Sequence, residues 1–260
     1  MLVAESGEPG WAFDLDGVIW TGRQPISGSA EAVSALMNDG HRVAFVTNNS
    51  FSTVAQQEEK LASFGIAADG LVVTSAMAGA ALVEPNERVF VLGGPGVEEA
   101  VGVRGATVVD GSDADDPPDA VVVGLDHNLS YERLSRAVLA LHAGARFIAT
   151  NTDSTYPSER GLLPGGGAIV AAVARAAGRD AVVAGKPHET QAELVRALLG
   201  PSGIMVGDRP ETDGRFAAAM GYRFGLVLTG VTRRQDLPVE PEPAWVADSV
   251  AQLVPEILAL

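Results

Sequence analysis

The chain has 260 residues, of which 47% are hydrophobic and 20% are charged, and its formal net charge at pH 7 is −15. This composition is typical of a folded globular protein and excludes a disordered or fibrous chain. The negative charge argues against a protein that covers the phosphate backbone of a nucleic acid. Without cysteine the chain has no disulfide and no thiolate nucleophile, and any metal must be held by oxygen or imidazole groups.

Residues 1–10 lack both a basic start and a long apolar stretch, so we expect no secretory signal and a cytoplasmic protein. No uninterrupted apolar segment approaches the ~20 residues that a membrane-spanning helix needs. We therefore expect neither a nucleic acid nor a membrane as a partner. The length fits one large domain or two smaller ones, and we expect two.

Short β-rich runs alternate with helical segments along the chain, which predicts an α/β fold with a parallel sheet flanked by helices. The predicted strands are residues 43–46, 71–73, 89–92, 120–123, 147–149, 181–184, 204–206 and 225–228. The predicted helices are residues 29–38, 131–142, 168–177, 189–199 and 250–260. Four glycines follow helices where left-handed backbone is expected, namely Gly40, Gly144, Gly178 and Gly200. Residues 110–118 predict an exposed acidic loop.

Two carboxylates, Asp14 and Asp16, follow the first apolar run at residues 11–13. Side chains two residues apart in an extended segment share a face, where two negative charges disfavour each other unless a cation or a shared proton compensates. One carboxylate can attack phosphorus or another electrophile, its neighbour can transfer protons, and a divalent cation can bridge the pair. The pattern therefore predicts a chemical site.

Thr47, Asn48 and Asn49 follow the strand predicted at residues 43–46 and offer a hydroxyl, amides and backbone N–H groups to an anion. Taken alone, such a polar turn is more often a helix cap than a ligand site. A glycine-rich segment at residues 93–96 suggests a dinucleotide loop, but Glu99 stands where the third glycine is required, so we reject that interpretation.

Lysine is scarce, because the chain has 16 arginines and only two lysines, Lys60 and Lys186. Lys186 lies between a glycine and a proline after the strand predicted at residues 181–184. Its ammonium group suits a phosphate or a carboxylate nucleophile. The alternative is a surface lysine in a turn.

Asp208 and Asp213 follow the strand predicted at residues 204–206. Asp208 is a candidate metal ligand, and Asp213 can bind through water or orient the loop. In the alternative interpretation, Asp213 caps the helix that follows. Because the carboxyl ends of parallel strands gather at one edge of a sheet, the four segments together predict a phosphoryl-transfer site. Mg²⁺, Lys186, Thr47 and backbone amides would stabilise the charge there.

The same four segments, residues 14–19, 47–50, 185–187 and 207–213, resemble the four motifs of the haloacid dehalogenase superfamily. Specifically, they resemble subfamily IIA, the NagD-like and 4-nitrophenylphosphatase-like phosphatases. The resemblance covers nearly the whole chain. It implies a Rossmann-like core of residues 1–79 and 185–260, with an inserted α/β cap domain at residues 80–184.

The resemblance also implies roles for the motif residues. Asp14 is the nucleophile that forms an aspartyl-phosphate, and Asp16 is the acid/base that protonates the leaving oxygen and then activates water. Thr47 and Lys186 hold the phosphoryl group.

Mg²⁺ is the cofactor that the resemblance implies. Its expected ligands are Asp14, the backbone carbonyl of Asp16, and Asp208, with Asp213 in support.

Four residues are expected to bind substrate, namely Asn48, Asn49, Asn151 and Asp153. The last two belong to residues 151–157, which resemble the cap loop that faces the substrate in relatives; an ordinary polar turn is the alternative.

We therefore expect Mg²⁺-dependent hydrolysis of a small phosphorylated metabolite, such as glycerol phosphate or a sugar phosphate. The predicted cap contains few aromatic residues (Phe90, Tyr131, Phe147 and Tyr156), which favours a small substrate over a nucleotide. The alternatives are a nucleoside monophosphate phosphatase, a phosphotransferase and a non-catalytic phosphate-binding protein. A homodimer formed through the cap is a further expectation from the resemblance.

Overall fold

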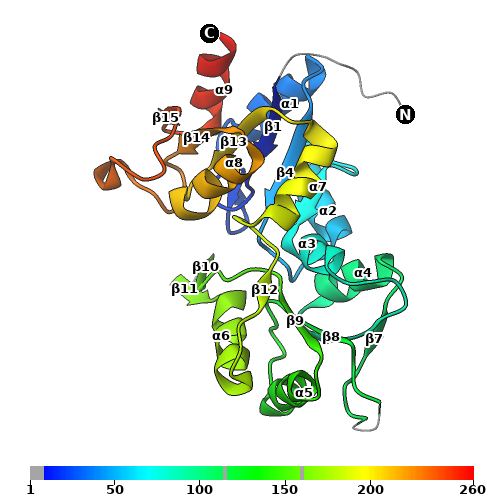
Figure 1. Cartoon of the computed structure of the whole chain (residues 1–260). Helices are drawn as coiled ribbons and strands as arrows, with labels where there is room; N and C mark the ends of the chain where they lie inside the picture. Colours follow the sequence, from blue (N-terminus) through cyan, green and yellow to red (C-terminus); the bar gives the residue numbers. More distant parts are fainter. Residues whose placement is uncertain (1–8, 114–115, 159–160) are drawn as a thin grey trace. The chain divides into compact units, whose positions relative to one another are not determined.

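The structure, a computed structural model, describes residues 9–113, 116–158 and 161–260 (Figure 1). The expectation of no secretory signal concerns residues 1–10. Residues 1–8 of that segment lie outside the described residues. The chain forms two compact units. Unit 1 comprises Met1–Val46, Lys60–Val72 and Ala192–Leu260, and unit 2 comprises Thr47–Glu59 and Val73–Gln191. The predicted domain limits differ from these units and stay a prediction.

Unit 1 is built on a parallel sheet with the strand order β15-β14-β13-β1-β4-β5, and the boundary between the units falls within β4 and β5. The strands are β1 (Gly10–Phe13), β4 (Val43–Thr47), β5 (Val72–Thr74), β13 (Gly203–Gly207), β14 (Arg223–Val227) and β15 (Trp245–Ala247). In the central strands β1, β4 and β13 every residue is buried, as expected for a parallel sheet covered on both faces. Phe13 pairs with Phe45 of β4 and with Val206 of β13, which sets the register at the carboxyl end of β1.

The helices that accompany this sheet are α1 (Ser29–Asn38), α2 (Val54–Ser63), α7 (Glu189–Leu199), α8 (Arg215–Met220) and α9 (Val250–Leu258). The first residues of α7 and of α2 belong to unit 2. A short antiparallel ribbon of β2 (Trp20–Thr21) and β3 (Gln24–Pro25) follows the carboxylate pair of the first motif.

Unit 2 has its own parallel sheet with the order β12-β9-β8-β6-β7. Its strands are β6 (Arg88–Leu92), β7 (Thr107–Val109), β8 (Ala120–Val123), β9 (Arg146–Ala149) and β12 (Val182–Val183). Its helices are α3 (Ser75–Ala81), α4 (Pro95–Val103), α5 (Tyr131–His142) and α6 (Gly166–Ala177), and a hairpin pairs β10 (Thr155–Ser158) with β11 (Gly161–Pro164). Alternate residues of β8 enter two separate cores, one with α5 and α6 and the other with α3 and α4.

The predicted α/β class with parallel sheets is confirmed. Helices α1, α5 and α7 have the predicted limits, whereas α6 begins at Gly166 rather than at residue 168. The four glycines after helices have φ values of +68° to +109°, as predicted. Helices α2, α3 and α4 were not predicted; α3, with four alanines and one glycine in seven residues, offers little contrast between an apolar and a polar face.

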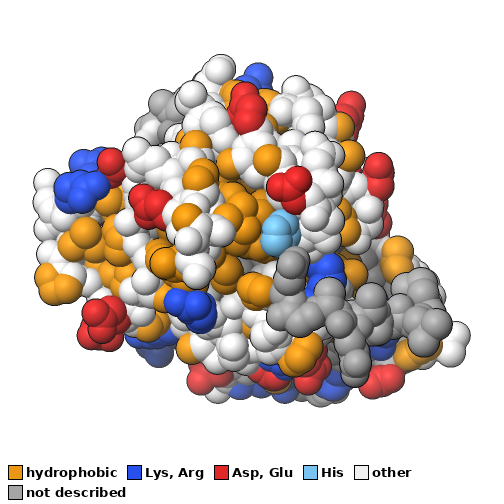
Figure 2. All heavy atoms as spheres, turned by 90° about the horizontal axis from the view of Figure 1, so that it is seen from above, with side chains coloured by type: hydrophobic (Ala, Val, Ile, Leu, Met, Phe, Trp, Pro, Cys, Tyr) orange, Lys and Arg blue, Asp and Glu red, His pale blue; other side chains and the backbone are white. Residues whose placement is uncertain are grey.

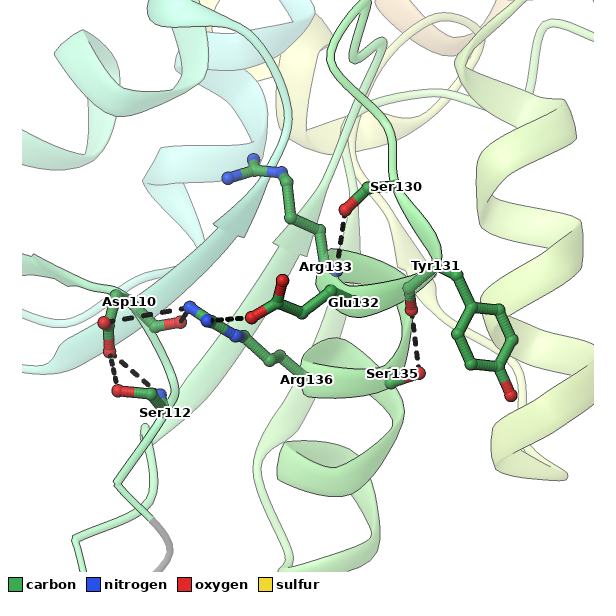
Figure 3. Close-up of polar contacts among 8 residues, drawn as sticks. All are labelled: Asp110, Ser112, Ser130, Tyr131, Glu132, Arg133, Ser135 and Arg136. Atoms are coloured by element: carbon green, nitrogen blue, oxygen red, sulfur yellow. Dashed lines mark hydrogen bonds and ion pairs between the residues drawn. The ribbon is translucent and has the colours of Figure 1, made fainter.

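Helix α5 carries a polar surface network (Figure 3). Ser130 Oγ accepts a hydrogen bond from the Arg133 N–H and caps the helix. Arg136 pairs with Glu132 one turn earlier and with Asp110, in the predicted acidic loop. Hydrogen bonds from Ser112 hold the pKa of Asp110 below its usual value. The described part of residues 110–118 is largely exposed and acidic, as predicted, except for Pro118, which is buried; residues 114–115 lie outside the described residues.

Within the described ranges, no helix has both the length and the hydropathy needed to cross a membrane. Figure 2 shows acidic, basic and hydrophobic side chains interspersed over one face of the molecule.

Candidate active site

Three buried carboxylates meet at the carboxyl end of the sheet of unit 1. Asp14 follows β1, Asp208 follows β13, and Asp213 lies in a short π-helical turn, η1 (Pro210–Gly214). Because β1 and β13 are parallel neighbours, Asp14 and Asp208 leave the sheet at the same edge. One carboxylate oxygen from each of the three residues lies within 4.8 Å of the others. We call Asp14, Asp208 and Asp213 the acidic cluster.

Two glycines make room for Asp208 in the acidic cluster. Gly17 has a φ of +86°, and a Cβ atom placed on it would lie 2.6 Å from Asp208 Oδ2. A Cβ atom on Gly230 would lie 1.9 Å from the same oxygen. Next to it, the Val231 N–H donates to Asp208 Oδ2 at 2.6 Å. The loop after β14 therefore encloses Asp208, and only glycine fits at both positions.

Asp213 holds the loop that carries Asp208. Its Oδ2 accepts hydrogen bonds from the backbone N–H groups of Asp208 (3.2 Å) and Arg209 (3.1 Å). Helix α8 begins after Gly214 with no side-chain cap, so the alternative in which Asp213 caps this helix is wrong. Of the interpretations left open by the sequence, orientation of the loop is the one that these contacts support.

Asp16 is not one of the three clustered carboxylates. Its side chain is partly exposed, and Oδ1 accepts a hydrogen bond from Trp20 Nε1 at 2.8 Å. The expected contact of Asp16 with a metal ion is through its backbone carbonyl and does not involve this carboxylate.

In unit 2, side-chain amides hold the backbone around Lys186. Asn48 Oδ1 accepts from the Lys186 N–H (2.9 Å), and Asn48 Nδ2 donates to the Lys186 carbonyl (3.1 Å) and to both carboxylate oxygens of Asp153 (3.1 and 3.2 Å). Lys186 is only 3% exposed, so the alternative of a surface lysine is wrong. Asn151 Nδ2 donates to the Asn48 carbonyl (2.8 Å), and Asn151 Oδ1 accepts from the Asp153 N–H (3.1 Å).

Gln191, which the sequence analysis missed, completes these contacts. Its Oε1 accepts from the Lys186 N–H at 2.7 Å, and its Nε2 donates to the carbonyls of Thr47 (3.1 Å) and Val73 (3.2 Å). The side chain is fully buried. The only sequence signal was an amide at the third residue of a predicted helix. We call Asn48, Asn151 and Gln191, with the groups that they bind, the amide network.

The polar turn after β4 is not a helix cap. Thr47 Oγ1 accepts from the Asn49 N–H (3.0 Å), and Asn49 Oδ1 accepts from the N–H groups of Phe51 (3.0 Å) and Ser52 (3.2 Å). Thr53 is the residue that caps α2, through the Gln56 N–H. Among the four predicted substrate-binding residues, Asn48, Asn151 and Asp153 therefore contact one another, whereas Asn49 Oδ1 accepts hydrogen bonds from its own turn.

Comparison with known proteins decides the family. A family model described as haloacid dehalogenase-like hydrolase matches residues 11–107, and a second HAD-like hydrolase model matches residues 183–253. The chain is 37% identical to the 5'-nucleotidase YutF of Bacillus subtilis, over 95% of this chain and 98% of that protein. This chain belongs to the haloacid dehalogenase superfamily, subfamily IIA.

Two further members of the superfamily are similar over most of their length. The acid sugar phosphatase of Staphylococcus saprophyticus is 37% identical, over 90% of this chain and 91% of that protein. The crystal structure of a glycerol phosphate phosphatase from Mycobacterium tuberculosis in complex with magnesium superimposes with a TM-score of 0.85 and 35% identity, over 95% of this chain and 77% of that chain.

Two glycines allow close contacts in unit 2 of this protein, as Gly17 and Gly230 do in unit 1. Gly96 allows close approach to residues 50–52, since its Cβ atom would lie 2.2 Å from the Ser52 carbonyl oxygen. Glu99, which broke the dinucleotide fingerprint, accepts a hydrogen bond from the Val54 N–H at the start of α2. A Cβ atom on Gly167 would lie 2.3 Å from the Thr152 carbonyl oxygen, so the first turn of α6 packs against the loop that carries Asp153.

Three rings in unit 2 form a cluster that the sequence did not predict, and only two of them are stacked. The Phe51 ring is stacked on the His127 imidazole, with the ring centroids 4.1 Å apart. The Tyr156 ring is tilted relative to the same imidazole, with the centroids 6.4 Å apart. Of the other aromatic residues predicted for the cap, Phe90 and Phe147 are buried in a core and Tyr131 is 86% exposed. Only tertiary structure brings residues 51, 127 and 156 together.

Proposed function

We propose that this protein hydrolyses a small phosphate monoester in the presence of Mg²⁺, through an aspartyl-phosphate formed on Asp14. The enzyme is a phosphatase, as its relatives in subfamily IIA are named. The observation that carries the proposal is the acidic cluster, three buried carboxylates with oxygens within 4.8 Å of one another.

The acidic cluster fits Mg²⁺, because this ion prefers oxygen ligands and is commonly held by one or two carboxylates together with substrate phosphate. Asp14, Asp208 and the backbone carbonyl of Asp16 would hold the ion, with Asp213 holding the loop of Asp208. When bound, Mg²⁺ offsets the negative charge of the carboxylates and of the phosphoryl group.

The protein's own residues supply the remaining chemistry. An Asp14 oxygen forms a bond to phosphorus while the bond to the leaving oxygen breaks, and Asp16 gives its proton to that oxygen. Asp16 then takes a proton from water, whose oxygen bonds to phosphorus as the bond to Asp14 breaks. The products are an alcohol and inorganic phosphate. Thr47 and Lys186 hold the phosphoryl group, and the amide network fixes the backbone from which Lys186 extends.

The substrate class that we propose is a polyol or sugar phosphate. The named relatives include a sugar phosphatase and a glycerol phosphate phosphatase. One observation favours a nucleoside monophosphate instead: Phe51 and His127 stack on each other in unit 2, and aromatic rings of this kind can also stack on a base. Contact of substrate with Asn48, Asn49, Asn151 and Asp153 belongs to the same proposal.

Four further expectations, on domain limits, assembly, location and the phosphoryl acceptor, belong to this proposal. Residues 80–184 act as the cap domain over a core of residues 1–79 and 185–260, and a homodimer forms through that cap. The protein works in the cytoplasm. Its phosphorylated intermediate passes to water rather than to another acceptor, because Asp16 is available to activate water.

A panel of phosphate esters tests the function. Phosphate release from glycerol 3-phosphate, sugar phosphates, nucleoside monophosphates and 4-nitrophenyl phosphate is compared as kcat/KM, with Mg²⁺ and with a chelator. We expect Mg²⁺-dependent release that is fastest with the smaller esters. A preference for nucleotides would favour stacking of a base on these rings, and a phosphorylated alcohol among the products would indicate a phosphotransferase. No release from any ester would favour a non-catalytic phosphate-binding protein.

A further inference from the structure

The turn after the nucleophile places Trp20 beside Asp16. The Gly17 N–H donates to the Trp20 carbonyl (2.7 Å), and the N–H groups of Ile19 and Trp20 both donate to the Leu15 carbonyl (2.9 and 3.2 Å). Asp16 and Trp20 form an isolated β-bridge across this turn. The spacing of four residues between the two side chains is therefore set by local backbone hydrogen bonds.

A single directed hydrogen bond joins the two side chains. Trp20 Nε1 donates to Asp16 Oδ1 at 2.8 Å, and Trp20 is almost completely buried. An indole N–H is only a donor, so Oδ1 of Asp16 acts as the acceptor in this contact. When Asp16 carries a proton, that proton therefore belongs on Oδ2. The contact selects one of the two carboxylate oxygens for proton transfer.

The indole ring is itself held from its other sides. Lys60 Nζ lies 3.7 Å from the centroid of the Trp20 ring, and the same ammonium group donates to the Gly22 carbonyl at 3.0 Å. The Phe64 ring lies 5.9 Å from the Trp20 ring. Burial lowers the pKa of Lys60, and the nearby charge of Asp16 opposes that shift. One of the chain's only two lysines thus contacts the ring that binds Asp16.

We propose that Trp20 is a positioning residue for Asp16, which fixes Oδ1 so that Oδ2 exchanges the proton with the leaving oxygen, and that Lys60 holds the indole in this orientation. The proposal deepens the proposed function and rests on it. Protonation matters most for a poor leaving group such as an alkoxide and least for 4-nitrophenolate, which departs readily as an anion. Loss of positioning should therefore depend on the leaving group.

The variant Trp20→Phe keeps an aromatic ring for Lys60 and removes the N–H donor. Formation of the phosphorylated enzyme is followed in a single turnover, which separates this step from the later attack of water. We expect the rate with glycerol 3-phosphate to fall roughly tenfold to a hundredfold, the loss associated with one hydrogen bond to a charged group. The rate with 4-nitrophenyl phosphate should fall by less than threefold, which corresponds to a rise of less than about 0.7 kcal/mol in the activation free energy.

Trp245→Phe is the matched control, because the Trp245 ring also lies against a cation, 3.8 Å from Arg223 Cζ, but belongs to β15, which is three strands away from β1 in the sheet. It should leave both rates unchanged. Lys60→Met, which keeps a long side chain without the charge, should give a smaller loss with the same preference for the poor leaving group. An equal loss with both esters in Trp20→Phe, or no loss with either, would overturn the proposal.

A spectroscopic measurement separates this inference from the proposed function. The chain has three tryptophans, so the three indole N–H resonances can be assigned with the Trp20→Phe and Trp245→Phe variants. We expect Asp16→Asn to shift the Trp20 resonance and to leave the Trp245 resonance in place. An unmoved Trp20 resonance would refute the positioning contact even in an active enzyme. If Asp16→Asn shifts the Trp20 resonance but the wild-type protein has no phosphatase activity, the proposed function is wrong and the positioning contact stands.

Discussion

The acidic cluster of unit 1 and the amide network of unit 2 are organised on opposite principles. In the acidic cluster, glycines allow three like-charged side chains to approach one another, and the repulsion among them is relieved when a cation binds. In the amide network, the neutral side-chain amides of Asn48, Asn151 and Gln191 donate to and accept from buried backbone groups. The first arrangement fits a cation, and the second satisfies the polar backbone groups around Lys186.

This difference predicts where substitutions act. A change in the acidic cluster should affect turnover and metal binding more than the free energy of unfolding. A change in the amide network should lower the free energy of unfolding, because it leaves buried polar groups without partners.

The largest effect is expected for Asp14→Asn. An amide cannot form the phosphorylated intermediate, so release of phosphate from 4-nitrophenyl phosphate should fall below detection, while the metal-free protein should remain folded. Asp39→Asn, at an exposed position after α1, is the control and should keep full activity. Turnover retained by the Asp14 variant would rule out this nucleophile.

Gly230→Ala tests whether close approach sets the geometry of Asp208. The new methyl group would lie 1.9 Å from Asp208 Oδ2 and must displace it. Because a misplacement of 1 Å can cost about 10²-fold, kcat/KM should fall by about that factor. Gly102→Ala is the control, since its Cβ atom meets nothing within 4 Å. Normal kinetics in the Gly230 variant would show that the loop can move without consequence.

Binding of Mg²⁺ should stabilise unit 1. At 100 times its dissociation constant, the ion should add about 2.7 kcal/mol to the free energy of unfolding, read as a rise in Tm. Asp208→Asn should lose most of this increment, whereas Gln191→Leu, outside the acidic cluster, should retain it. A melting temperature that a chelator leaves unchanged in the wild-type protein would contradict the proposed metal site.

Gln191→Leu should have the smallest effect on turnover. Its effect on the free energy of unfolding should still be measurable. The substitution removes the partner of the Thr47 and Val73 carbonyls, so the free energy of unfolding should fall by about 1–3 kcal/mol. Denaturant unfolding measures this loss, with the exposed Gln235→Leu as the control. Equal stability of the two variants would show that the amide network contributes little to the fold.

The sequence predicted well wherever a local pattern carries the information. The limits of α1, α5 and α7 followed from apolar spacing together with the glycines near their ends. The convergence of Asp14 with Asp208 was predicted from a general property of parallel sheets, namely that strand ends share an edge.

Prediction failed where a residue acts through a distant partner. Gln191 is one amide in a helix until the structure places it against β4 and β5. Gly230 carries no motif of its own, and its importance comes from Asp208, 22 positions earlier in the chain. Trp20 received no role from the sequence, although its N–H donates to Asp16.

The amino-acid sequence by itself determined the family, the parallel α/β class and which carboxylates follow the strand ends, because these depend on periodicity and on residues adjacent in the chain. Tertiary structure alone decided which oxygen of Asp16 is held, which glycines admit Asp208, and which amides bind the backbone of Lys186. These features depend on distances of a few ångströms between remote segments, and such distances arise only when the strands are paired and the side chains packed.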